Sequence, residues 1–304
     1  MIRQMYQIQR APRSEYVPIR TLQYHVQVWG TPSPDKIPLV MVHGWMDVAA
    51  SYQFVVDALN HDHYVIAPDW RGYGKTACPH VDNYWFPDYL ADLDFLLDHY
   101  APTGQVNLVG HSMGGNVVML YAGVRPERIR RLINLEGFGM PATTPDQAPK
   151  RYATWMDELK KLHNGEMDLR AYDAVSGVAR RLMKTNPRLT EDKAGWLARH
   201  WASENIDGTW SILGAAAHKV SNAQLYRVEE IRAIYERLSM PVLAVEASDN
   251  SLDVWWKGRY KLAEYHERLK VVSNVEIARI EDAGHMMHHD QPEVLAALIE
   301  RFIA

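Results

Sequence analysis

The pattern Gly110-x-Ser112-x-Gly114 is the sequence feature that most constrains the fold. It directly follows the apolar run 106–109, which predicts a strand, and directly precedes the segment 113–125, which predicts a helix. A serine between a strand and a helix has to lie on a sharp turn, and glycines two residues away on either side avoid the clashes that side chains would create there. We therefore expect a turn that presents Ser112 as a nucleophile; the alternative is a glycine-rich turn with a helix-capping serine.

Short apolar runs alternate with helical patterns over most of the chain, which favours a mostly parallel sheet with crossover helices. The predicted strands and helices cover the following residues: strands 16–19, 22–29, 38–43, 64–68, 106–109, 128–135, 241–245 and 275–280, and helices 86–100, 113–125 and 292–303.

The region from about residue 140 to residue 240 lacks this alternation and shows helical patterns. They cover residues 152–162, 171–184, 191–203 and 228–238. We therefore predict a sheet domain formed by residues 1–140 and 241–304, with a helical insertion at residues 141–240.

Charge and cysteine content exclude several classes of protein. The formal net charge is −4, so there is no basic excess of the kind that nucleic-acid binding or a polybasic membrane anchor requires, and we expect a small-molecule partner. Cys78 is the single cysteine, which excludes an intramolecular disulfide. The segment Met1–Tyr6 lacks the apolar stretch of a secretory signal, and no run of about 18 apolar residues occurs, so we predict a soluble cytoplasmic protein.

A serine hydroxyl becomes nucleophilic when a base takes its proton. His285 lies between the last predicted strand and the last predicted helix, where such a base is expected. The neighbouring His288, His289 and Asp290 resemble a metal-binding cluster, but three ligands on one turn lack a second, distant ligand pair. We therefore predict no metal, and expect His288 and His289 to lie at the surface or to support the site.

A carboxylate should orient the base, and three acidic residues are candidates. Asp249 follows the strand 241–245 after three residues, which is the more usual place, and we prefer it. Glu136, at the end of the strand 128–135, is the alternative acid, and Asp253 is a third candidate.

Attack on a carbonyl creates an oxyanion, which backbone N–H groups can stabilise. We expect the N–H groups of Met113, directly after the nucleophile, and of Trp45, after His43-Gly44, to form this oxyanion hole. Candidate substrate contacts are Trp45, His111, Trp155 and Trp210, although aromatic residues at helical spacing more often build a core. The segment Ala217-His218-Lys219 could place a base or a cation near a substrate, but such residues are more often solvated.

With these residues identified, the chain resembles the α/β-hydrolase fold superfamily, in the lineage of capped serine hydrolases. The segments that carry the resemblance are His43-Gly44-Trp45, Asp69-Trp70-Arg71-Gly72-Tyr73-Gly74, Gly110-His111-Ser112-Met113-Gly114-Gly115 and Ala283-Gly284-His285. The resemblance implies a mostly parallel eight-stranded sheet flanked by helices, with residues 141–240 as the inserted cap, a Ser-His-Asp triad and no cofactor.

Members of this superfamily differ in the residue at the position of Ser112, on the sharp strand-to-helix turn that is called the nucleophile elbow. Epoxide hydrolases and haloalkane dehalogenases are similar around His43 and Asp69 but carry aspartate at the elbow, so Ser112 argues against both. Cofactor-free dioxygenases of the same fold keep a serine there and use the His-Asp pair as a base.

The leading hypothesis is a serine hydrolase that cleaves a small, hydrophobic ester, or a related thioester, amide or carbon–carbon bond, through an acyl-enzyme. The alternative is a cofactor-free dioxygenase that acts on a hydroxylated heteroaromatic compound. A third hypothesis, a ligand receptor with the same fold and negligible turnover, is disfavoured by the intact elbow and base.

Overall fold

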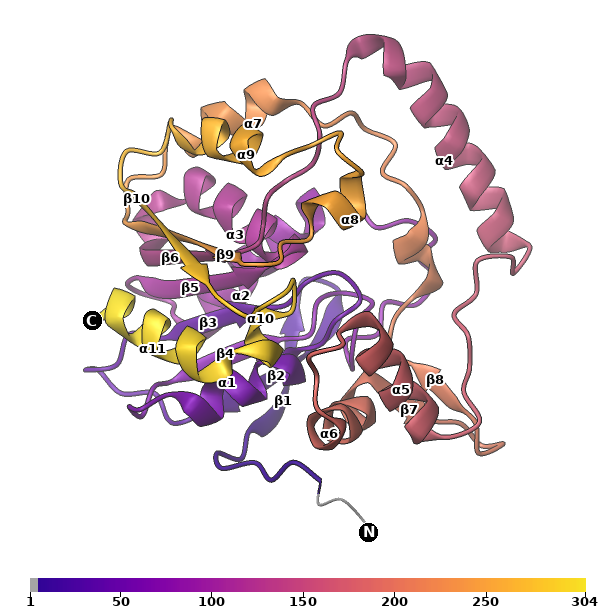
Figure 1. Cartoon of the computed structure of the whole chain (residues 1–304), viewed down its shortest axis with the longest axis horizontal. Coiled ribbons are helices and arrows are strands. Elements are labelled where there is room, and N and C mark those ends of the chain that lie inside the picture. Colours follow the sequence, from indigo (N-terminus) through magenta and orange to yellow (C-terminus); the bar gives the residue numbers. More distant parts are fainter. Residues whose placement is uncertain (1–4) are drawn as a thin grey trace.

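The computed structural model describes residues 5–304, which form one large sheet with helices on both faces and a helical region to one side (Figure 1). The first four residues of the segment Met1–Tyr6, from which we predict the absence of a secretory signal, lie outside this range. Within residues 5–304, no helix combines the length and the apolar character that crossing a bilayer requires.

The eight strands of the large sheet lie in the order β1-β2-β4-β3-β5-β6-β9-β10. β2 pairs antiparallel with β1 and with β4, and every other neighbouring pair is parallel. This confirms the predicted mostly parallel, eight-stranded sheet. The strands are β1 (Arg13–Ile19), β2 (Leu22–Trp29), β3 (Leu39–Val42), β4 (Val65–Pro68), β5 (Val106–His111), β6 (Ile129–Leu135), β9 (Val242–Ala247) and β10 (Val275–Ile280).

Alternate residues of the central strands face two separate hydrophobic clusters. Leu39 and Met41 of β3 face the layer that contains α1 and α11, whereas Val40 and Val42 face the layer of α2, α3, α7 and α9. Both faces of the sheet are therefore covered (Figure 1). These helices, with two short ones, are α1 (Gln53–Ala58), α2 (Pro87–Tyr100), α3 (Met113–Val124), α7 (Val228–Tyr235), α8 (Leu252–Trp256), α9 (Leu262–Leu269), α10 (Met287–Asp290) and α11 (Pro292–Ile303).

The inserted region packs around a third hydrophobic cluster, in which Val178, Leu182 and Leu197 of the insertion meet Val48 and Phe54 of the sheet domain. The sequence patterns predict helices in this region, one of them over residues 191–203. In the structure that helix ends at residue 201, and the chain then forms a two-stranded antiparallel hairpin. The elements of the inserted region are α4 (Ala148–His163), α5 (Val175–Thr185), α6 (Glu191–Trp201), β7 (Ala202–Glu204) and β8 (Trp210–Ile212). Four 3₁₀ turns complete the described elements: η1 (Ala49–Tyr52), η2 (Pro126–Arg128), η3 (Pro145–Gln147) and η4 (Ala216–Lys219).

Helix α7 packs with the sheet domain rather than with the insertion. Its residues Ile231 and Tyr235 belong to the same hydrophobic cluster as Val117 of α3. Just after α7, the Arg237 guanidinium donates a hydrogen bond to the backbone oxygen of Gly123, at 2.9 Å. We therefore propose that the cap comprises residues 141–227, and that the stretch 228–240 is part of the sheet domain.

His218 of η4 anchors the cap to the sheet domain. Its ring stacks between Tyr73, at a centroid distance of 3.7 Å, and Tyr84, at 3.6 Å. The expectation of a solvated side chain is therefore wrong for His218, because two aromatic faces cover its ring. The indole N–H of Trp45 donates to the backbone oxygen of His218, at 3.1 Å, and a backbone bond from Gly74 to Leu213 reinforces the contact.

The stacked position of His218 predicts an acid-sensitive contact. Burial lowers the pKa of His218 from 6.5 to about 3. Between these values the unfolded chain binds a proton that the folded chain does not, so stability falls as the pH falls from 6.5 towards 3, by up to about 1.4 kcal/mol per pH unit from this group. In His218→Phe, which keeps the stacking and cannot titrate, the loss should be smaller. Urea unfolding of both proteins across this pH range tests the prediction; parallel curves would contradict it.

Candidate active site

Ser112 lies on a strained turn between β5 and α3. Its backbone has φ 53° and ψ −114°, an unusual conformation for a residue with a side chain. Close packing leaves no room for side chains at the flanking glycines: a Cβ at Gly110 would lie 2.3 Å from the backbone oxygen of Gly114, and a Cβ at Gly114 would lie 2.4 Å from that of Val42. The Ser112 N–H donates to the backbone oxygen of Leu135, at 2.8 Å, which fixes the turn against β6.

His285 contacts the Ser112 hydroxyl. It lies in the loop between β10 and α10, and its Nε2 atom is 3.0 Å from Ser112 Oγ. Its Nδ1 atom is 2.7 Å from a carboxylate oxygen of Glu136. Because a carboxylate only accepts, Nδ1 carries the proton and Nε2 is free to accept the serine proton. The three side chains therefore form one series of hydrogen bonds.

The Glu136 carboxylate is buried and held by further donors. Oε1 accepts the backbone N–H of Ala247 at 3.1 Å, and Oε2 accepts the hydroxyl of Ser251 at 3.2 Å. The side chain has no exposed surface, so these donors and His285 replace the water that an ionised carboxylate would otherwise bind. Glu136 also has a left-handed backbone, with φ 51°, at the point where the chain leaves β6.

Asp249, the preferred acid in the sequence analysis, does not pair with His285. Its side chain is 72% exposed and lies 3.4 Å from the guanidinium of Arg188. Asp253 is also exposed, on α8. The structure thus corrects the order of the candidates: the alternative, Glu136, occupies the position next to His285.

The order of the strands in the sheet explains why Glu136, and not Asp249, lies next to His285. β6 and β9 are parallel neighbours, with Leu135 opposite Val245, so the residues that follow both strands emerge at the same edge. β9 continues to Ala247, two residues beyond the predicted end, and the N–H of Ala247 binds the Glu136 side chain. Glu136 therefore reaches His285 from the adjacent strand, whereas Asp249 extends past it into solvent.

The loop that carries Gly44 and Trp45 borders Ser112. A Cβ at Gly44 would lie 3.1 Å from the Cβ of Ser112. The Met113 N–H belongs to the first residue of α3, where no helical acceptor exists. The two residues that carry the predicted oxyanion-hole donors thus lie close to Ser112. That their N–H groups stabilise an oxyanion stays a prediction.

His43 fixes this loop. It is completely buried, its Nδ1–H donates to the backbone oxygen of Gly44 at 2.8 Å, and its Nε2 accepts the backbone N–H of Trp70 at 2.9 Å. The Trp70 indole N–H donates back to the His43 backbone oxygen at 3.0 Å. The sequence motifs around His43 and Asp69 therefore serve one another as structural partners.

His111, a predicted substrate contact, is buried beneath the site. Its Nε2 atom donates to the backbone oxygen of His285, at 2.7 Å. Burial, with the nearby rings of His288 and His285, lowers the pKa of His111 well below its ordinary value. A neutral His111 therefore supports the His285 loop from below instead of lining a pocket.

The three tryptophans predicted to contact substrate differ in position. Trp45 is 43% exposed and packs edge-on against Trp255, at a centroid distance of 6.3 Å, near the site. Trp210 packs on the hydrophobic cluster of the cap, and Trp155 lies on α4. In residues 5–304, no hydrogen bond or ring contact joins Trp155 or Trp210 to the three hydrogen-bonded side chains, so their role stays a prediction.

His288 and His289 are buried rather than at the surface, and their carboxylate neighbour is Asp47, not Asp290. One ligand atom from each of Asp47, His288 and His289 lies within 4.8 Å of the others. Among residues 5–304 no fourth ligand joins them, and the ring nitrogens lack the acceptors that usually orient metal-bound histidines. The predicted absence of a metal stays a prediction.

Asp290 instead links the cap to the histidine loop, a contact that the sequence analysis missed. One of its oxygens accepts the backbone N–H of Gly284 at 2.8 Å, and the other accepts the side-chain amide of Asn186 at 2.7 Å. Asn186 directly follows α5 and is 104 residues away in the chain, so no local pattern could indicate the pair. The residue before His285 is thus tied to the cap.

Comparison with known proteins agrees with this architecture. The family model described as alpha/beta hydrolase fold matches residues 37–292. A zebrafish (Danio rerio) protein named "Serine hydrolase-like protein" is 23% identical over 301 residues, which cover 97% of this chain and 90% of that one. The "Cis-3-alkyl-4-alkyloxetan-2-one decarboxylase" of Shewanella oneidensis is 26% identical over 88% of this chain and 81% of its own.

Among solved structures, the "Thioesterase Domain From Curacin Biosynthetic Pathway" is similar with a TM-score of 0.81 and 22% identity, over 95% of this chain and 99% of that domain. At this identity, the likeness establishes the fold. Because the family model covers most of the chain and the sheet order agrees with this fold, the chain belongs to the alpha/beta hydrolase fold family and is a hydrolase.

Proposed function

We propose that this hydrolase cleaves a small, hydrophobic acyl ester or thioester, or a related amide or carbon–carbon bond, through an acyl-enzyme on Ser112. The observation that carries the proposal is the series of hydrogen bonds from Ser112 through His285 to Glu136, at 3.0 and 2.7 Å. A serine, a base and an orienting carboxylate in hydrogen-bond contact are the arrangement that activates a serine hydroxyl.

In the proposed reaction, Ser112 Oγ attacks the substrate carbonyl while His285 Nε2 takes its proton. The backbone N–H groups of Trp45 and Met113 stabilise the oxyanion, and Glu136 stabilises the imidazolium that forms. His285 then donates the proton to the leaving group. A water molecule, deprotonated by His285, releases the acyl group and restores the serine.

The position of the site supports an apolar acyl group. Trp45 and Trp255 are 43% and 53% exposed and lie next to each other. Trp45 is on the loop that borders Ser112, and its indole N–H contacts the cap at His218. Exposed aromatic surface beside a reactive serine favours binding of apolar substrate portions. Thioesters are already among the bonds expected from the sequence, and the thioesterase name of a structural neighbour supports keeping them in the proposal.

The identity of the nucleophile can be tested directly. A fluorophosphonate probe should label Ser112 stoichiometrically, as peptide mass spectrometry of the labelled protein would show. Ser112→Ala should lose at least about 10⁴-fold in kcat/KM on p-nitrophenyl esters of graded chain length. Oxygen uptake with a hydroxylated heteroaromatic compound that persists in Ser112→Ala would instead indicate the dioxygenase alternative.

The acid can be identified by a matched pair of substitutions. Glu136→Gln keeps the size of the side chain but removes the charge that faces His285, so kcat should fall roughly 10²- to 10⁴-fold. Asp249→Asn, the same chemical change on an exposed carboxylate, should leave kcat within about threefold, since exposed ion pairs contribute little. Ester hydrolysis by both variants decides the matter, and a larger loss in Asp249→Asn would overturn the assignment.

The contact between Asn186 and Asp290 predicts a rescue. Asp290→Asn places an amide NH2 opposite the Asn186 amide, which can accept from it only by turning its oxygen away from the Arg188 N–H that this oxygen accepts at 3.2 Å. Asn186→Asp sets two carboxylates face to face. Each single variant should therefore displace Gly284 and lower kcat roughly 10-fold, with a smaller change in KM. In the double variant, the amide introduced at position 290 can donate to the carboxylate introduced at position 186 and still accept the Gly284 N–H. We expect kcat to recover most of the loss; losses that simply multiply would show that the pair does not position His285.

A further inference from the structure

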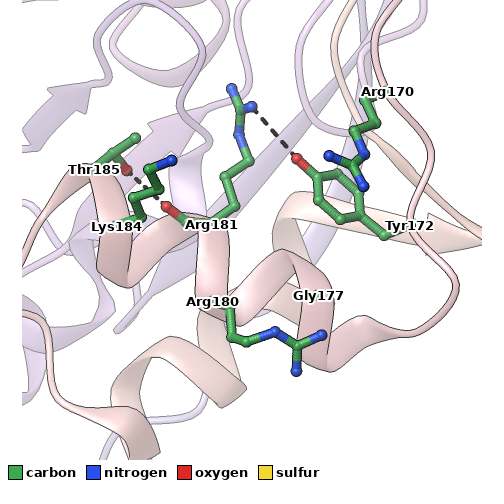
Figure 2. A pocket seen from close by; sticks show the side chains of 7 residues that line it. All are labelled: Arg170, Tyr172, Gly177, Arg180, Arg181, Lys184 and Thr185. Carbon is green, nitrogen blue, oxygen red and sulfur yellow. Dashed lines mark hydrogen bonds between the residues drawn. The ribbon is translucent and has the colours of Figure 1, made fainter.

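A groove of about 550 Å³ lies on the cap, between α5 and the segment that leads into it (Figure 2). Seven residues line it, and no aspartate or glutamate is among them: Arg170, Tyr172, Gly177, Arg180, Arg181, Lys184 and Thr185. Four of the seven carry a positive charge. The whole chain has a formal net charge of −4, so this concentration of cations contrasts with the rest of the sequence.

The positive charge of the groove is not balanced by ion pairs. Within residues 5–304, none of Arg170, Arg180, Arg181 and Lys184 forms an ion pair with an acidic side chain. Their contacts are neutral: Arg181 donates to the Tyr172 hydroxyl at 3.4 Å, Arg170 lies over the Tyr172 ring, and Arg180 donates to Ser176 at 3.4 Å. No acidic side chain of the described residues therefore neutralises the positive charge of the groove.

The side chains around Tyr172 are arranged to meet a ligand from one side. In Figure 2, Arg170 and Arg181 lie at the Tyr172 ring, Lys184 lies on the other side of Arg181 beside Thr185, and Arg180 points away from these side chains. Arg181 and Lys184 are three residues apart on α5 and so share one face of the helix. The bare Gly177, one turn before Arg181, lets the Tyr172 ring pack against the helix, since a Cβ there would lie 3.0 Å from the ring.

The groove is connected through neighbouring residues to the loop that carries His285. Thr185, which lines it, is the last residue of α5 and directly precedes Asn186. Asn186 binds Asp290, which binds the N–H of Gly284, the residue before His285. One end of the groove is therefore joined to the His285 loop through Asn186 and Asp290.

We propose that this groove binds a phosphate-bearing group of the size of a pyrophosphate or a nucleotide. Guanidinium groups bind phosphate oxygens in pairs, and a lysine adds a further charge, so two arginines and a lysine around one concave site suit a phosphate better than a carboxylate. The volume is in the range of small-molecule sites. The concave shape and the net negative charge of the chain favour a small anion over a membrane or a nucleic acid.

The phosphate has two possible sources: the remote end of an acyl substrate, which rests on the proposed function, or a free phosphate compound. Binding is measured first without turnover, by titrating the full chain with pyrophosphate in a calorimeter at low ionic strength. We expect saturable binding that weakens as salt is added. This measurement needs no turnover, so it stays valid even if the proposed function is wrong.

The variant Arg181→Gln/Lys184→Gln should bind pyrophosphate at least about 10-fold more weakly. Its control is Lys160→Gln/Lys161→Gln, which removes the same charge from exposed positions on α4 and should bind like the unaltered chain. Arg170→Gln, outside α5, should also weaken binding, which guards against a folding defect in the helix. No saturable binding, or equal binding by all these proteins, would overturn the proposal, as would tighter binding to anionic vesicles than to pyrophosphate.

The source is then distinguished with two thioesters of one acyl group, one on coenzyme A and one on N-acetylcysteamine, which lacks phosphate. If the phosphate is part of the substrate, Arg181→Gln/Lys184→Gln should raise KM at least about 10-fold for the first thioester and leave KM for the second unchanged. Equal KM changes, together with pyrophosphate binding that the variant abolishes, would assign the groove to a free phosphate compound.

Discussion

Parallel pairing of β5, β6, β9 and β10 is the constraint on which the rest of the site depends. Parallel strands end at the same edge, and their register is fixed by the buried side chains on both faces. Ser112 follows β5, Glu136 follows β6 and His285 follows β10, so three residues far apart in the sequence emerge together. A shift of one residue in any of these strands would turn its buried side chains to the opposite face and would displace its terminal residue from this edge.

The strained backbone conformations of the site are held by this sheet. Ser112 and Glu136 both have positive φ, and the backbone N–H of each is bonded to the neighbouring strand, to Leu135 and to Val245. Backbone conformations of this kind persist where surrounding structure determines them, and here the determinants are ladder hydrogen bonds and glycine contacts. The turn at Ser112 is thus held in place by packing within the protein itself.

The cap is joined to the sheet domain by a shared hydrophobic cluster and by specific polar and ring contacts. The His218 ring is held between two tyrosines, and the side chain of Asn186 reaches Asp290 beside the histidine loop. Asn186 directly follows α5, and α5 lines the positively charged groove. The proposed groove and the contact to the His285 loop therefore lie next to each other along the chain.

The sequence by itself determined the alternation of strands and helices, the turn at Ser112 and the position of His285, because buried strands and glycine-flanked turns leave local patterns. Tertiary structure alone decided that Glu136 and not Asp249 meets His285, that His111, His288 and His289 are buried, that β7 and β8 form a hairpin, and that Asn186 binds Asp290. Both acids follow neighbouring parallel strands, so spacing along the chain fits either one. Which acid meets His285 depends on the donors that hold its carboxylate. Ala247 and Ser251 donate to Glu136, and these contacts join residues more than a hundred positions apart.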